Sequence, residues 1–319
     1  MNWISGADLV AAVSASGGLG TLGPNAGQTT PCNDEREVAE RLRGQINKVR
    51  SITDKPFAVN VAVASGDAKK FSDAYVKTVI DERVPVAIVT MGGPQIYTRE
   101  LKNAGVKVIH TISTVRHGKR AEIEGVDAVV AGGYESGGHL GNEDQTTLCL
   151  VPQVVDALSI PVIAGGGITD ARGLVAALAL GAEAVFMGTR FLATNESDAH
   201  PNVKQAVLKA TDSDLVVLCK NRGVGMSRVI KNAWSNKFYE KEISGASLEE
   251  LVNLMESHIM AEPGYLVSRM YGTFCLGDVV QGSLSVSGAV GSINELMSAG
   301  DVVKQMMSQA KELLKNLNK

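Results

Sequence analysis

Several common features are scarce in this chain of 319 residues. No apolar run approaches the roughly eighteen residues that cross a bilayer, so we expect no membrane segment. No basic stretch followed by an apolar one precedes the first glycines, so we expect no secretory signal and a cytoplasmic protein. The formal net charge of −3 gives no reason to expect nucleic acid as a partner.

Cysteine is also sparse. The four cysteines, Cys32, Cys149, Cys219 and Cys275, are widely separated and form no CxxC pair. This spacing argues against a metal site and against a disulfide framework, and it is typical of reduced thiols in a cytosolic protein. We therefore predict no bound metal.

Apolar residues and glycine are abundant: 45% of the chain is hydrophobic and it contains 34 glycines. Short Val/Ile/Ala-rich runs alternate with helical stretches, which predicts parallel strands buried on both faces. The expected strands are 19–22, 57–63, 86–90, 108–111, 128–131, 162–164 and 184–187. The expected helices are 5–15, 34–51, 69–83, 95–104, 114–123, 151–158 and 171–180.

The repeating strand–helix spacing favours an α/β barrel over an open sheet. A closed TIM (β/α)8 barrel needs eight strands, and only seven are expected here. The chain opens with MNWISGADLVAAVSASGG, which is typical of the loop and helix that follow a first strand. We therefore predict a TIM barrel that lacks its first strand in this chain. A barrel that is closed in some other way is the alternative.

The alternation of strands and helices stops after Arg190. Residues 195–275 contain helical stretches, expected at 203–210, 227–236 and 247–260, and are interpreted as a helical lid inserted after the last strand. The predicted division is a barrel over 1–194, the lid over 195–275 and a terminal segment over 276–319. That segment holds a Gly/Ser-rich loop, 282–292, and a helix from about 293 to 316. Two interpretations of the loop stay open, a flexible linker and a segment that returns to the ligand.

Residues 161–191, PVIAGGGITDARGLVAALALGAEAVFMGTRF, read as strand, glycine turn, helix, strand and second glycine turn. Glycines 165–167 stop the first strand, Asp170 is placed to cap the helix, and Gly188 and Thr189 follow the second strand. Two parallel strands thus end in backbone N–H groups without side chains in the way. This is typical of a phosphate site after the last two barrel strands, although tight turns alone would also use glycine.

A second motif, GGYESGGHLGNED at 132–144, follows the strand DAVVA directly. Loops at the carboxyl ends of barrel strands carry the catalytic groups. Gly138 lets backbone approach a flat ligand, and His139 is placed to act as an acid or base near neutral pH. A histidine that caps local backbone is the alternative.

Asn60 lies within the apolar strand FAVNVAV, where an unpaired amide is costly. We expect it to bond either a ligand at the barrel mouth or neighbouring backbone. The remaining histidines, His110, His117, His200 and His258, lack glycine-rich surroundings, and we expect structural or solvent-exposed positions for them.

With these residues in view, the chain resembles the nitronate monooxygenase (2-nitropropane dioxygenase) family of FMN-dependent barrels, which includes the flavin-type enoyl-acyl-carrier-protein reductase II branch. The resemblance rests on EsGGH, on AGGGI…GAEAV…GTRF, on DKPFAVNVAV, on RVIKN and on the loop 282–291. It implies a TIM barrel with non-covalent FMN. By resemblance, Gly166, Gly167, Gly188 and Thr189 would hold the FMN phosphate, Asn60 and Gly138 would lie along the flavin, and His139 would be the catalytic residue.

The chain departs from the family pattern in three places. The usual opening strand PI-x-QGGM is represented only by Met1, which agrees with the missing first strand and puts FMN binding in doubt. Gly132 stands where the reductase branch tends to carry Glu. Ser287 and Gly288 replace a Gly–Gln pair of the terminal loop.

The resemblance leaves three functions open. The first is oxidation of alkyl nitronates with O2, and the second is enoyl-thioester reduction with NAD(P)H as reductant and acyl carrier protein as a possible partner. The third is an impaired barrel that binds FMN weakly. A homodimer is a further expectation. A basic rim on the lid would suit a carrier protein, although such a run is also typical of a solvated face; it comprises Lys220, Arg222, Arg228, Lys231 and Lys237.

Overall fold

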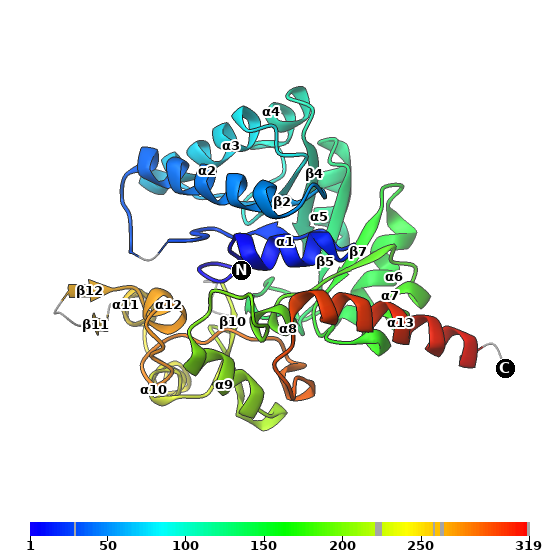
Figure 1. The fold of residues 1–319 in the computed structure, drawn as a ribbon. Helices are drawn as coiled ribbons and strands as arrows, with labels where there is room; N and C mark the ends of the chain where they lie inside the picture. Colours follow the sequence, from blue (N-terminus) through cyan, green and yellow to red (C-terminus); the bar gives the residue numbers. More distant parts are fainter. Residues whose placement is uncertain (29, 221–224, 258, 262–264, 318–319) are drawn as a thin grey trace.

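A curved parallel sheet forms the centre of the protein in the computed structural model (Figure 1). The structure describes residues 1–28, 30–220, 225–257, 259–261 and 265–317. The sheet has seven strands in the order β1-β2-β3-β4-β5-β7-β8, and each neighbouring pair is parallel. The strands are β1 (Thr21–Leu22), β2 (Ala58–Ala62), β3 (Val86–Thr90), β4 (Lys107–Ile112), β5 (Ala128–Gly132), β7 (Val162–Gly165) and β8 (Ala184–Phe186). All seven predicted strands are confirmed.

Alternation along each strand separates two apolar layers. Val59, Val61 and Val89 belong to the larger cluster, which packs the outer face of the sheet against the helices. Ile88 and Val130 belong to a smaller cluster on the inner face. Burial on both faces explains why the strands read as continuous apolar runs in the sequence.

Helices cover the outer face of this sheet. They are α1 (Ala7–Ala15), α2 (Glu35–Ile52), α3 (Lys69–Asp81), α4 (Thr98–Asn103), α5 (Val115–Ile123), α6 (Thr147–Ala157) and α7 (Ala171–Ala179), with a short 3-10 turn at Gly66–Ala68. A short helix after β8, α8 (Thr189–Leu192), packs elsewhere, because Leu192 belongs to the cluster of Trp3 and Ile4. Asp170 caps α7 as predicted, because its carboxylate accepts a hydrogen bond from the Arg172 amide at 2.8 Å. Asp34 caps α2 in the same way.

The sheet does not close among the described residues. β1 pairs only with β2 and β8 only with β7, so these two strands are the edges. Ala184 on β8 is exposed. The arrangement is a half-barrel with flanking helices, and it confirms the prediction of a TIM-like barrel that lacks a closing strand.

The segment after β8 differs from the all-helical lid expected from the sequence. The expected helix over 227–236 is wrong in its first half, because Ser227–Ile230 forms strand β10 and a helix, α10 (Ala233–Ile243), begins only after it. β10 pairs antiparallel with β9 (Leu215–Leu218) and with β6 (Gly138–His139), the latter from the barrel. The alternating sequence SRVI signals this strand, but the neighbouring helical residues obscured it.

The other elements of this segment are helical or short. They are α9 (Pro201–Lys209), the 3-10 turn Asp212–Asp214, α11 (Leu248–Glu256), β11 (Ile259–Ala261), β12 (Tyr265–Val267) and α12 (Arg269–Phe274). The helix predicted over 247–260 therefore ends earlier than expected. His258, expected at a structural or exposed position, lies outside the described residues. The division of the chain at 194 and 275 stays a prediction.

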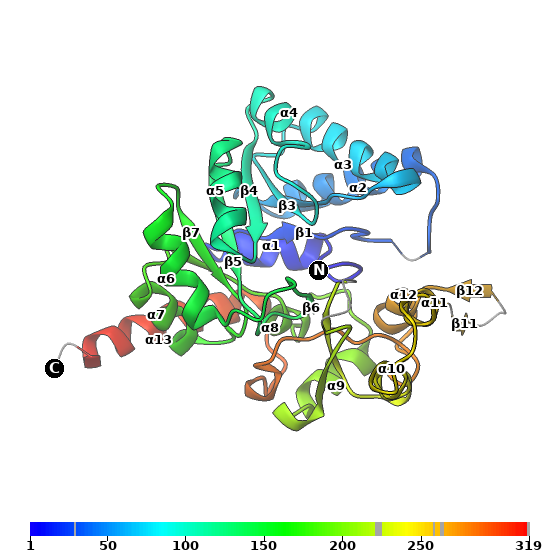
Figure 2. The same ribbon diagram turned by 180° about the vertical axis from the view of Figure 1, so that it is seen from behind.

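The chain returns to the barrel at its end. After the 3-10 turn Val290–Ser292, α13 (Ala299–Leu317) lies along α7 and α1 (Figures 1 and 2). The helix begins six residues later than expected, because Ile293 is buried in the cluster formed by the lid and the terminal loop. No helix of the described residues is both long and apolar enough to cross a membrane.

His110 is a buried histidine within β4, and its Nδ1 atom has no hydrogen-bond partner among the described residues. Burial, with a smaller contribution from His117, lowers its pKa from 6.5 to about 4. The unfolded chain therefore binds a proton between these values that the folded chain does not, so stability falls as the pH drops through this window.

We predict that this one residue makes the free energy of unfolding fall by up to about 3 kcal/mol between pH 6.5 and 4. Urea unfolding of the protein and of His110→Leu across this range measures the difference in slope. Identical slopes for the two proteins would show that His110 does not stay neutral in the folded state.

Candidate functional site

Four loops meet at the carboxyl edge of the sheet. Residues 133–137 follow β5, residues 166–170 follow β7, Gly188 follows β8, and the terminal loop around Ser287 lies against them. Because all seven strands run in the same direction, their following loops share one edge. This convergence places most of the predicted site residues close together.

Gly166 and Gly167 form the turn after β7 with φ angles of +103° and +73°. A Cβ atom on Gly166 would lie 2.7 Å from Ser136 Oγ, and one on Gly167 would lie 3.0 Å from Glu135 Cβ. Backbone conformation and space both require glycine here. The two amide N–H groups make no hydrogen bond to any other described residue, so they are available to an anion.

Gly188 contributes another such amide at the end of β8. Its φ of −117° is ordinary, and the nearest atom to a Cβ at this position is Met1 Sδ at 3.5 Å. Nothing in the described fold therefore requires a glycine at residue 188. Gly188 and the turn at Gly166 follow two paired strands, β8 and β7.

Thr189 is buried, and its Oγ1 accepts a hydrogen bond from the Ser287 amide at 2.9 Å. This contact ties the terminal loop to the end of β8. Of the two interpretations of the glycine-rich loop, the structure shows the one in which it returns to the predicted site. The hydroxyl proton of Thr189 remains available to a second partner.

Asn60 lies on the inner face of β2 and is buried. Its Nδ2 donates to the Ile88 carbonyl at 3.2 Å, and its Oδ1 accepts from Thr90 Oγ1 at 3.2 Å. Neighbouring strand β3 thus provides the partners that burial of an amide demands. One N–H of the amide is left for a ligand at the mouth of the half-barrel.

His139 lies with Gly138 in β6, opposite Ser227 of β10. The side chain keeps exposed surface, while the surrounding protein lowers the pKa of the imidazole by desolvation. Desolvation therefore favours the neutral form of the ring, which is the form that accepts a proton. Among the other histidines, His200 accepts from the Asn202 amide and caps α9, a structural position as expected.

Glu135 and Thr147 are two residues of the site that the sequence reasoning missed. Glu135 Oε2 accepts hydrogen bonds from the Thr147 amide at 2.7 Å and from Thr147 Oγ1 at 2.9 Å. The same hydroxyl lies 3.0 Å from the Gly166 carbonyl. Glu135 thus caps α6, for which Thr146 makes no side-chain cap, and connects the loop of His139 to the turn at Gly166.

The terminal loop also binds the loop that precedes His139. The Gly288 amide donates to the Glu135 carbonyl at 2.9 Å. A Cβ on Gly137 would lie 2.6 Å from the Val286 carbonyl carbon, so the two backbones are in direct contact. A glutamate and a threonine twelve residues apart, between a strand and a helix, are the only sequence signal for this arrangement.

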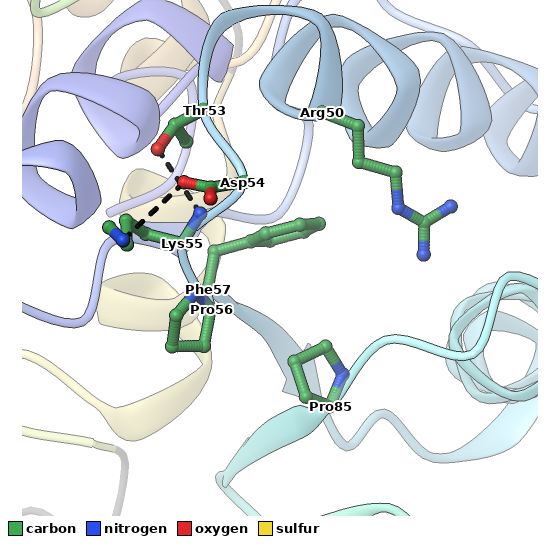
Figure 3. A pocket seen from close by; sticks show the side chains of 7 residues that line it. All are labelled: Arg50, Thr53, Asp54, Lys55, Pro56, Phe57 and Pro85. Carbon is green, nitrogen blue, oxygen red and sulfur yellow. Dashed lines mark hydrogen bonds and ion pairs between the residues drawn. The ribbon is translucent and has the colours of Figure 1, made fainter.

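A pocket at the opposite edge of the sheet is lined by Arg50, Thr53, Asp54, Lys55, Pro56, Phe57 and Pro85 (Figure 3). Phe57 and Pro85 directly precede β2 and β3, so this pocket lies at the amino ends of the strands. It is therefore separate from the converging loops. No group of three or more His, Cys, Asp or Glu side chains suited to a metal occurs within the described part of the chain.

This fold and site define a TIM-like α/β barrel whose carboxyl edge presents backbone amides to an anion. The family model for nitronate monooxygenase matches residues 1–78 and 70–309. The chain belongs to the nitronate monooxygenase family, whose members are oxidoreductases.

Two curated relatives illustrate the range of this family. A Rhodococcus jostii protein named (3aS,4S,5R,7aS)-5-hydroxy-7a-methyl-1-oxo-octahydro-1H-indene-4-carboxyl-CoA dehydrogenase is 41% identical over 70% of this chain. The alignment spans only 59% of that relative's length. A probable nitronate monooxygenase of Staphylococcus haemolyticus is 38% identical over 66% of this chain and 68% of its own length.

Solved structures cover more of the chain. FabK from Thermotoga maritima is 36% identical, with a TM-score of 0.85 over 100% of this chain and 93% of its own. A nitroalkane oxidase from Streptomyces ansochromogenes is 25% identical, with a TM-score of 0.80 over 98% of this chain and 94% of its own. Similarity in both cases extends through the half-barrel and the lid.

We predict that Glu135→Ala lowers the free energy of unfolding by about 1–2 kcal/mol, since it removes a charged acceptor from the first turn of α6. Glu135→Gln retains an acceptor oxygen and should lose less. Urea unfolding measures both, with Glu143→Ala as the matched control, because Glu143 is exposed in the same loop. An equal loss in the Glu143 variant would contradict the capping role.

Proposed function

We propose that this protein is an FMN-dependent oxidoreductase that oxidises alkyl nitronates with O2. The proposal of a bound FMN rests on one observation: the backbone amides of Gly166, Gly167 and Gly188, at the ends of adjacent strands, have no hydrogen-bond partner among the described residues. Such a cradle suits a phosphate group, which is bound by backbone N–H donors. FMN is the phosphate-bearing cofactor general to this family. Thr189 and the spare N–H of Asn60 are further candidate contacts.

FMN would supply the electron-accepting chemistry, which no side chain of the site can provide. The protein's own groups would bind and orient the substrate. His139 would act as a general base on the nitroalkane from which the nitronate forms or, when protonated, stabilise the negative charge of the nitronate. In a balanced reaction, two nitronate ions and one O2 would give two carbonyl compounds and two nitrite ions.

A second candidate reaction is the reduction of enoyl thioesters by NAD(P)H. The match to FabK over the whole chain favours it, at higher identity than the match to the nitroalkane oxidase. His139 would then stand near the enolate oxygen or carbon that receives a proton. Acyl carrier protein as a partner, a homodimer and a cytoplasmic location belong to this proposal as well.

Gly188→Val tests the phosphate cradle, because the φ angle at residue 188 is ordinary and the nearest atom to a Cβ there is Met1 Sδ at 3.5 Å. We predict that the variant folds normally but binds FMN at least about tenfold more weakly, since the side chain occupies the space of the phosphate. Quenching of FMN fluorescence during titration measures the affinity. Gly44→Ala in α2 is the control, because a Cβ there meets no atom within 4 Å.

FMN affinity unchanged by Gly188→Val would place the phosphate elsewhere. No binding by the unmodified chain, even at high FMN concentration, would refute the flavin proposal. Weak binding without turnover would support the third function expected from the sequence, an impaired barrel. Substitution of Gly166 or Gly167 is less informative, because their positive φ angles make any side chain disruptive.

His139→Ala should retain FMN and lower kcat by at least about a hundredfold, the range of acid–base contributions. The assay is run twice, with a nitronate under air and with crotonyl-CoA plus NADH or NADPH without oxygen. Nitrite release identifies the first reaction, and loss of the enoyl absorbance identifies the second. His200→Asn, which keeps a capping side chain on α9, is the control. Unchanged turnover in His139→Ala would exclude this residue from the mechanism.

A further inference from the structure

Two cations share one aromatic ring beside the loop of His139. The guanidinium carbon of Arg228 lies 4.9 Å from the centre of the Tyr134 ring, and Lys220 Nζ lies 5.6 Å from the same centre. Arg228 belongs to β10 and Lys220 follows β9, so both come from the lid, whereas Tyr134 follows β5 of the barrel. The ring attracts each cation, but it carries no charge to neutralise them.

Neither cation has an acidic partner within the described part of the chain, where no ion pair involves Lys220 or Arg228. The nearby carboxylate of Glu135 is bound to Thr147 instead. Arg228 donates through Nη2 to the Tyr134 carbonyl at 2.9 Å, and its Nε is buried without a partner. A half-buried guanidinium with one neutral acceptor leaves much of its charge unsatisfied.

A second arginine shows what a purely structural arginine looks like in this fold. Arg190 also has an Nε without a partner, but it is 6% exposed, and its Nη2 donates to the carbonyls of Ala193 and Glu295. The Arg190 side chain is therefore buried and not accessible to a ligand. Arg228 is only half-buried and Lys220 is exposed, so these two are accessible to a ligand.

The cation pair is also adjacent to the proposed catalytic residue. In the pairing of β10 with β6, Arg228 is opposite Gly138 and Ser227 is opposite His139. Arg228 is therefore one residue along the ribbon from the partner of His139, and its side chain starts on the opposite face of the two strands. The distal part of an extended substrate would reach this position while its reacting part lies at the mouth of the half-barrel.

We propose that Lys220 and Arg228, supported by Tyr134, bind a phosphoryl group of the substrate or co-substrate at the rim of the site. The inference deepens the second candidate reaction, enoyl-thioester reduction, and rests on it for the location of the reacting centre. A phosphoryl group offers several acceptor oxygens and a negative charge to the guanidinium and the ammonium. Two molecules of the second candidate reaction carry one, the phosphopantetheine arm of a thioester and a nicotinamide dinucleotide.

The test compares ligands that differ by the phosphoryl group alone. Isothermal titration of the FMN-loaded protein with 4′-phosphopantetheine and with pantetheine should give at least about a tenfold difference in Kd at low ionic strength. Lys220→Ala and Arg228→Met should each remove most of this difference. Lys237→Ala is the matched control, since Lys237 is an exposed lysine of the same lid on α10 and should retain it.

The same variants are titrated with NADH and NADPH. Weaker binding of the dinucleotides alone would assign the site to the co-substrate, and weaker binding of phosphopantetheine alone would assign it to the thioester. Equal affinity for both pantetheine compounds, together with dinucleotide binding that neither variant changes, would overturn the proposal. Because Arg228 also holds the Tyr134 carbonyl, Lys220→Ala keeps the test valid if Arg228→Met unfolds.

Binding is measured here without turnover, which separates this inference from the proposed function. A phosphoryl preference in a protein that performs neither candidate reaction would leave the site in place and refute the reactions. Turnover of crotonyl-CoA that neither Lys220→Ala nor Arg228→Met reduces would support the reaction and refute the phosphoryl site. Arg222, another member of the basic rim expected from the sequence, lies outside the described residues.

Discussion

The parallel hydrogen-bonded ladder from β1 to β8 is the constraint on which the rest of the structure depends. Because each strand pairs with its neighbour in the same direction, every following loop emerges at one edge. The apolar layers on both faces fix the register, since a shift by one residue would turn Val59 and Val61 away from the helices. Loops separated by more than a hundred residues in sequence thereby meet, and the candidate site is a consequence of strand direction.

Contacts between loops then hold this edge in a defined shape. Glu135 is central, because its carboxylate caps α6 through Thr147 and its carbonyl accepts from Gly288 of the terminal loop. Ser287 in turn donates to Thr189 at the end of β8. The polar groups of these loops satisfy one another, while the amides of Gly166, Gly167 and Gly188 are left without protein partners. Hydrogen-bond donors without protein partners are the groups that an anion site requires.

The lid contributes charged side chains to the candidate site, whereas the barrel contributes backbone N–H groups. β10 pairs with β6 and thereby brings Arg228 and Lys220 onto Tyr134. His139 is on the barrel side of this pairing, and desolvation lowers the pKa of its imidazole. Two kinds of polar group thus lie at this edge, the backbone amides proposed to bind a cofactor phosphate and the unpaired cations at the rim. Small nitronates would need only the first, whereas a thioester on a phosphorylated carrier would use both.

The sequence by itself determined the seven strands, the cap at Asp170, the two glycine turns and the open edge of the barrel, because apolar periodicity and glycine act locally. Prediction from the sequence failed where an element depends on residues that are distant in the chain. The strand Ser227–Ile230 exists because β6 and β9 pair with it, and the return of the terminal loop depends on Thr189. The link from Glu135 to Thr147 and the unpaired charge of Arg228 likewise depend on which groups folding brings together. Only the tertiary structure decides such contacts, because hydrogen bonding and charge pairing are properties of neighbours in space.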